Sequence, residues 1–156
     1  LHSKNVIHRD LNPNNVMVTG PLDKLQAKLA DFGLSTLKQE TLKRTSTVGT
    51  PIYAAPEVLS SSVFTEKSDV YSFGLTLWFM ENIKDPFEDV HTPHQLITAV
   101  VMRKERPSLR GCVLFPTLIS KCWDNDPAKR PTSSEIVDAI QAVLNPPSAY
   151  QPPSQS

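Results

Sequence analysis

Short apolar runs alternate with polar turns over the first 30 residues of the chain. These runs are rich in β-prone residues and predict three short strands, at 6–7, 16–18 and 27–30. Thr19-Gly20-Pro21 predicts a turn between the second and the third strand. The later segment 34–50 is polar, rich in Ser and Thr, and without apolar periodicity, so we expect it to be a loop.

Helical periodicity replaces this pattern in the second half of the chain. Val70, Phe73, Leu77 and Trp78 recur at helical spacing, so we expect a mostly buried helix over 68–78. Further apolar repeats predict three more helices, at 93–103, 118–123 and 136–144. A capping-box sequence at 132–135 predicts the start of the last helix.

Two polar segments are expected to be exposed to solvent. Lys104–Pro107 has mixed charge and follows a predicted helix, so solvation is its expected role. Residues 145–156 contain four prolines together with Ser and Gln, which predicts a disordered tail. We therefore expect one folded domain over 1–144, followed by this tail over 145–156.

The composition excludes several classes of partner. The 156 residues carry 16 Lys and Arg and 16 Asp and Glu, so no overall field favours nucleic acid or a membrane surface. The longest apolar stretch, 73–80, is far shorter than the roughly 20 residues that span a bilayer. Two cysteines do not make a disulfide framework and no secretory leader pattern opens the chain, so we expect a cytoplasmic protein.

Three short motifs follow one another in a fixed order. His8-Arg9-Asp10-Leu11 with Asn15 comes first, then Asp31-Phe32-Gly33, then Ala55-Pro56-Glu57. This ordered set resembles the catalytic half of a eukaryotic protein kinase. The resemblance covers residues 1–144. It implies an α+β fold, the large C-terminal lobe of a kinase, which is mainly helical with short strands at the catalytic cleft.

The small lobe of a kinase has no counterpart in this sequence. The resemblance would place a G-x-G-x-x-G loop and a strand lysine before the catalytic loop, and neither occurs among these residues. We therefore expect the chain to be a fragment of a catalytic domain with its small lobe missing. Such a fragment is expected to be inactive as a kinase on its own.

The resemblance implies a chemical role for four residues. Asp10 would accept or orient the proton of the substrate hydroxyl. Asn15 and Asp31 would hold Mg²⁺ beside the phosphates of ATP, because this hard cation takes oxygen ligands. Met17 lies where the family places an apolar residue under the adenine ring, with packing in the core as an alternative. ATP and Mg²⁺ are therefore the expected cofactors.

Asn12 departs from the family pattern. Serine/threonine kinases usually carry Lys at this position, where it helps to hold the transferred phosphate. An amide donates a hydrogen bond without a charge, so the same contact would be weaker. By resemblance, Thr50 would contact both Asp10 and Asn12. The departure leaves open an alternative in which the chain is a pseudokinase or a non-catalytic binding module.

The segment 34–50 resembles the activation segment of kinases. Thr45, Ser46 and Thr47 are candidate phosphosites within it, for an upstream kinase or for autophosphorylation. A phosphate adds negative charge and can order a loop by pairing with an arginine, and Arg9 is the expected partner. An unmodified, solvated loop is the alternative.

Five further residues are implied to be structural. His8 and Phe32 resemble members of the internal apolar stack of kinases. Glu57 is expected to be buried against Arg130. Asp69 is expected to accept backbone N–H bonds from the catalytic loop, with ordinary helix capping as the alternative.

Two further motifs indicate the substrate. Gly49-Thr50 resembles serine/threonine kinases, whereas Cys122-Trp123 resembles tyrosine kinases and the tyrosine-kinase-like group. Together they point to the tyrosine-kinase-like group of serine/threonine kinases. The expected activity is transfer of the γ-phosphoryl group of ATP to Ser or Thr hydroxyls of protein substrates.

Overall fold

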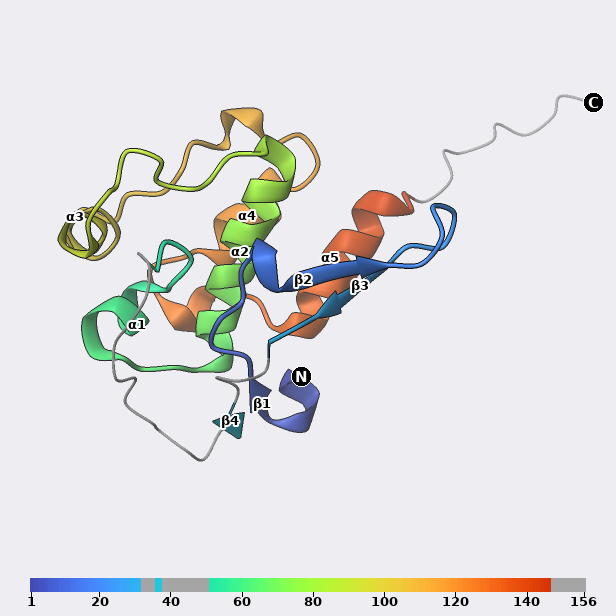
Figure 1. Cartoon of the computed structure of the whole chain (residues 1–156), viewed down its shortest axis with the longest axis horizontal. Coiled ribbons are helices and arrows are strands. Elements are labelled where there is room, and N and C mark those ends of the chain that lie inside the picture. The colour runs from blue at the N-terminus through green and yellow to red at the C-terminus, as the bar shows by residue number, and fades with distance from the viewer. Residues whose placement is uncertain (32–35, 38–50, 147–156) are drawn as a thin grey trace, which may run out of the picture.

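The structure is a computed structural model, and it describes residues 1–31, 36–37 and 51–146. Within these residues the strands form two separate two-stranded sheets (Figure 1). β1 (Val6–Ile7) pairs antiparallel with β4 (Thr36–Leu37). β2 (Val16–Thr19) pairs antiparallel with β3 (Gln26–Leu29), from Val16 opposite Leu29 to Thr19 opposite Gln26. The three predicted strands are therefore present.

Strand β4 corrects the prediction of a continuous loop over 34–50. Its two residues pair with β1, about 30 positions earlier in the chain. A strand of two residues is too short to show an alternating pattern, so its pairing with a distant partner decides its conformation.

Five α-helices are present in the described residues. They are α1 (Pro56–Ser61), α2 (Glu66–Asn82), α3 (Pro93–Ile97), α4 (Pro116–Cys122) and α5 (Ser133–Leu144). Helix α3 continues as a π-helical turn over Thr98–Met102, so the helix expected at 93–103 is present with a widened second half. The described part of the chain contains no helix long and apolar enough to cross a membrane.

Helix α1 was not predicted from the sequence. It has only six residues, which is too short to show apolar periodicity. Pro56 occupies its first turn, where a missing N–H costs nothing because that donor has no partner inside the helix.

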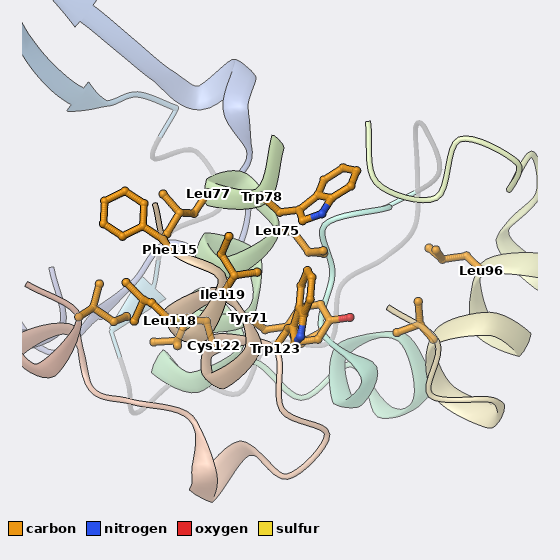
Figure 2. Close-up of a cluster of buried hydrophobic side chains, with 14 residues drawn as sticks. Tyr71, Leu75, Leu77, Trp78, Leu96, Phe115, Leu118, Ile119, Cys122 and Trp123 are labelled. Carbon is orange, nitrogen blue, oxygen red and sulfur yellow. The ribbon is translucent and has the colours of Figure 1, made fainter. Parts of the chain in front are cut away.

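Helix α2 forms the centre of the core. Figure 2 shows its side chains facing those of α4 (Pro116–Cys122), with Phe115 and Trp123 at the two ends of that helix. Tyr71 and Leu75 of α2 and Ile119 of α4 are fully buried. A Cβ on Gly74 would lie 2.7 Å from the Cβ of Cys122, so the absence of a side chain lets the two helices approach closely.

Arg106 is a second correction, because Lys104–Pro107 was expected to be solvated. Its guanidinium lies 5.1 Å from the centre of the Tyr71 ring, and Arg130 lies at the same distance. Arg106 also donates hydrogen bonds to the carbonyl of Trp123 and to Asn125 Oδ1. Burial raises the pKa of Tyr71 to about 12. Arg106 is thus part of the packing around α2.

The first turn of α5 agrees with the sequence. In α5 the hydroxyl of Thr132 accepts the N–H of Glu135, and the Glu135 carboxylate accepts the N–H of Thr132. This is the predicted capping box. Thr65 and Ser68 form a similar reciprocal pair at the start of α2. The second box fixes the end of α2 that carries Asp69.

Candidate active site

The loop between β1 and β2 carries the predicted base, and its own amide side chains hold it. Asn15 Nδ2 donates to the carbonyl oxygen of Asp10 at 2.7 Å and lies 3.3 Å from Asp10 Oδ2. Asn12 Nδ2 donates to the same carbonyl at 3.0 Å. The backbone of Asp10 is therefore held by two amide side chains, and Asn15 also contacts its half-buried carboxylate.

Asn12 stabilises the loop through hydrogen bonds to its backbone, next to Asp10, the predicted base. Its Oδ1 accepts the backbone N–H of Asn14 at 3.0 Å and caps a 3₁₀ turn over Pro13–Asn15. From the sequence we expected a phosphate contact from Asn12, and this capping role was not predicted. An Asn followed by Pro is itself a helix-start signal, so the sequence held the information for this cap.

His8 connects the base to the segment that leads to Asp31. The side chain is buried, with Nε2 at 3.0 Å from the Ala30 carbonyl oxygen. Because a carbonyl only accepts, Nε2 carries the proton and Nδ1 is left to accept. The N–H of Asp10 points to that Nδ1, at a long 3.4 Å. One imidazole thus sets the spacing between Asp10 and the residue before Asp31.

Asp69 holds the backbone of the catalytic loop. Its two carboxylate oxygens accept the N–H of His8 at 2.7 Å and the N–H of Arg9 at 2.9 Å. This is the contact expected from the sequence. Arg9 adopts a left-handed φ of 72°, which a non-glycine residue rarely does unless its surroundings impose it. The carboxylate of Asp69 therefore stabilises a strained loop next to Asp10.

The hairpin of β2 and β3 brings Asn15 and Asp31 together. The N–H of Ala30 donates to the carbonyl oxygen of Asn15 at 2.8 Å, which extends the pairing by one residue beyond the strands. Asp31 follows directly, is exposed, and has a left-handed φ of 56°. Two residues that are 16 positions apart in sequence therefore lie at one edge of the hairpin.

The chemistry of these two side chains fits Mg²⁺. Asn15 uses its Nδ2 inside the loop, so its amide oxygen is the atom offered to a cation. Mg²⁺ takes one or two protein oxygens and completes its shell with water and phosphate oxygens. In the described parts of the chain, no three His, Cys, Asp or Glu side chains are grouped so as to hold a metal. A site of one amide and one carboxylate, completed by phosphates, remains compatible with that result.

The segment after residue 50 is attached to α2. Ser72 Oγ donates to the carbonyl oxygen of Tyr53 at 2.8 Å, and Tyr53 Oη donates to Asp85 Oδ1 at 3.2 Å. Burial first, and then the negative charge of Asp85, raise the pKa of Tyr53 above its usual range. The phenol therefore stays protonated and keeps its donor role at neutral pH.

Glu57 and Arg130 form the predicted pair. Arg130 Nη1 lies 2.6 Å from Glu57 Oε1, and Nη2 lies 2.9 Å from Oε2. The arginine side chain is fully buried, whereas 19% of the glutamate side chain is exposed. The expectation that Glu57 is buried therefore holds only in part. The two parallel hydrogen bonds tie α1 to the segment before α5.

Comparison with known sequences identifies the family. The family model of protein tyrosine and serine/threonine kinases matches residues 1–140. The chain belongs to the protein kinase family.

Curated relatives agree with this assignment. The kinase chain is 40% identical over 151 residues to the dual specificity protein kinase shkC of Dictyostelium discoideum, which covers 92% of the chain. It is 39% identical over 143 residues to the serine/threonine/tyrosine-protein kinase HT1 of Arabidopsis thaliana, and this match covers 90% of the chain. It is 38% identical over 161 residues to the serine/threonine-protein kinase CTR1 of the same plant, and this match covers 100% of the chain. The chain spans only 29%, 36% and 19% of these three proteins.

Two residues of the kinase chain that were predicted to belong to the site have surroundings that the sequence did not indicate. Met17 is 53% exposed, so core packing, the alternative for this residue, is wrong. The Arg9 guanidinium lies 5.1 Å from the centre of the Phe64 ring. Phe32, Thr45, Ser46, Thr47 and Thr50 lie outside the described residues, as do positions 147–156 of the predicted tail.

Sequence reasoning missed one member of the site. His2 Nε2 lies 2.9 Å from Asp69 Oδ2, the oxygen that also accepts the N–H of His8. No local pattern marks His2, because the two partners are separated by 67 positions. A histidine shortly before the first motif was the only available signal.

Proposed function

We propose that the protein containing this chain transfers the γ-phosphoryl group of ATP to Ser or Thr hydroxyls of other proteins. The observation that carries the proposal is the joint fixation of Asp10, Asn15 and Asp31 by one short loop and one hairpin. Phosphoryl transfer depends mainly on positioning and on charge neutralisation. This arrangement supplies the positioning, together with oxygen ligands for a Mg²⁺ ion that would neutralise charge.

Asp10 is the base in this proposal. Its carboxylate accepts the proton of the substrate hydroxyl as the new O–P bond forms, and Asn15 holds the carboxylate in place. Asn15 and Asp31 would hold Mg²⁺, which supplies positive charge against the phosphates when it is bound. The catalytic centre takes no charged lysine from position 12, where this chain has Asn.

The finer features of the proposal follow the resemblance. The chain would be the large lobe of a kinase domain, with the exposed Met17 on the face that meets the adenine ring. Phosphorylation at Thr45, Ser46 or Thr47 would regulate it through Arg9. A cytoplasmic location is part of the proposal, and the two free cysteines support a reducing compartment.

Replacement of Asp31 by Ala in the native-length protein tests the proposal. We expect loss of Mg²⁺-dependent ATP binding, measured by calorimetry, and loss of ATP-dependent transfer to protein substrates, because a carboxylate ligand is removed. Asp23→Ala is the matched control, since Asp23 is an exposed carboxylate in the turn between β2 and β3. Unchanged transfer in Asp31→Ala would exclude the assigned role.

A pseudokinase is the second candidate function, and Asn12 is the observation that favours it. Both ends of this side chain are engaged by the loop backbone, and it brings no positive charge to a phosphate. Mg²⁺-dependent ATP binding by the parent protein without any transfer to proteins would support this second function over the first.

A further inference from the structure

A chain of hydrogen bonds leads from the surface of the molecule to the catalytic loop. It starts at the hydroxyl of Ser133, in the first turn of α5, whose Oγ lies 2.6 Å from His2 Nδ1. The other ring nitrogen of His2 lies 2.9 Å from Asp69 Oδ2. Asp69 in turn accepts the N–H groups of His8 and Arg9, directly before Asp10.

The chemistry of the groups fixes the direction of these bonds for a neutral ring. The carboxylate of Asp69 can only accept, so His2 carries its proton on Nε2. Nδ1 then has a lone pair and accepts the hydrogen of the Ser133 hydroxyl. Every donor along the path therefore points inward, toward Asp69.

The two bonds on opposite sides of the imidazole determine its orientation. A histidine held at one nitrogen can still tilt and turn about that bond, whereas bonds at both nitrogens fix the ring plane. The exposed fraction of the side chains falls along the path. Ser133 is exposed, whereas 16% of the His2 side chain and 6% of the Asp69 side chain are exposed. A buried carboxylate depends on well-placed donors, because solvent cannot replace them.

We infer that Ser133 is a positioning residue for the catalytic loop, acting through His2 and Asp69. The inference rests on the proposed function for its effect on phosphoryl transfer, but its structural part does not. Ser133 holds His2, His2 holds one oxygen of Asp69, and Asp69 holds the strained backbone at Arg9 next to the base. Helix α5, the last helix of the described residues, is thereby connected to Asp10.

Amide hydrogen exchange at His8 and Arg9, followed by NMR in the native-length protein, tests the structural part. Ser133→Ala is expected to speed exchange at both amides by on the order of fivefold, the factor carried by one neutral hydrogen bond. The resonance of His2 Nδ1 is expected to shift as well, because that nitrogen loses its donor. Ser134→Ala is the matched control, since Ser134 is an exposed neighbour in the same helical turn. Ser133→Thr keeps the hydroxyl and is expected to retain the parent exchange rates.

Steady-state kinetics on the same variants test the link to transfer. Ser133→Ala is expected to lower kcat by a similar factor and leave KM for ATP unchanged, because the base and not the nucleotide site is displaced. Exchange rates in Ser133→Ala equal to those of the parent and of Ser134→Ala would overturn the inference. If Ser133→Ala speeds exchange but the parent protein transfers no phosphate, the proposed function is contradicted and the positioning role remains intact.

Discussion

At the scale of single residues, the site depends on side chains that hydrogen-bond the backbone. Asn12 and Asn15 both donate to the Asp10 carbonyl, and Asp69 accepts two successive backbone N–H groups. Such bonds fix loop geometry directly, because they act on the chain and not on other mobile side chains. Asp10, the proposed base, is therefore positioned by the residues closest to it in the chain and by the buried carboxylate of Asp69.

Glu57→Ala is predicted to destabilise the protein by about 3–5 kcal/mol, because it leaves the buried guanidinium of Arg130 without its anionic partner. Chemical denaturation followed by fluorescence measures the free energy of unfolding. Glu105→Ala is the control, since Glu105 pairs with Arg103 on the surface and both side chains are at least half exposed. That variant should change stability by no more than about 1 kcal/mol. Equal losses in the two variants would refute the special role of the buried pair.

At the scale of elements, helix α2 organises both the core and the catalytic loop. Buried residues occur on consecutive positions, at 68–71 and 74–78, instead of along one stripe. Helix α4, strand β1 and the turns at 109–111 and 127–129 all contact it. The first turn of α2 carries Asp69, so the packing of the helix fixes the carboxylate that holds the catalytic loop.

Gly74→Ala is predicted to destabilise the protein by about 1–3 kcal/mol, because the new methyl group would overlap the Cβ of Cys122 in α4. Alanine has the higher helix propensity, so a loss of stability would have to come from packing. Thermal and urea unfolding of the variant measure the effect. Met80→Ala, on an exposed position of α2, should stay within about 0.5 kcal/mol of the parent. A Gly74→Ala protein as stable as the parent would contradict the close approach of α2 and α4.

At the scale of the whole molecule, the sequence predicted the features that a local pattern or a family motif marks. The strands next to the catalytic loop, the start of α5 and the pair of Glu57 with Arg130 were accessible from local patterns or from motifs. The pairing of β4 with β1 and the packing of Arg106 on Tyr71 were not, because each joins distant segments without a local signal. The contact of His2 with Ser133 spans 131 positions and was equally inaccessible.

The same limit applies to the chemistry of the site. The resemblance of the motifs to those of kinases predicted which side chains belong together as a base and as oxygen ligands for Mg²⁺. They did not predict how the loop keeps its shape. That information lies in the capping role of Asn12 and in the left-handed backbone of Arg9, which tertiary contacts impose.

The most direct test of the account is the rate of Mg²⁺-dependent phosphoryl transfer from ATP to protein Ser and Thr by the native-length protein, compared with its Asp10→Asn variant. Asparagine keeps the size of the side chain and removes its ability to accept a proton. The account predicts active transfer by the parent and a loss of about 10²–10⁴-fold in the variant, with ATP binding retained. Equal rates in the two proteins would contradict the assignment of Asp10 as the base.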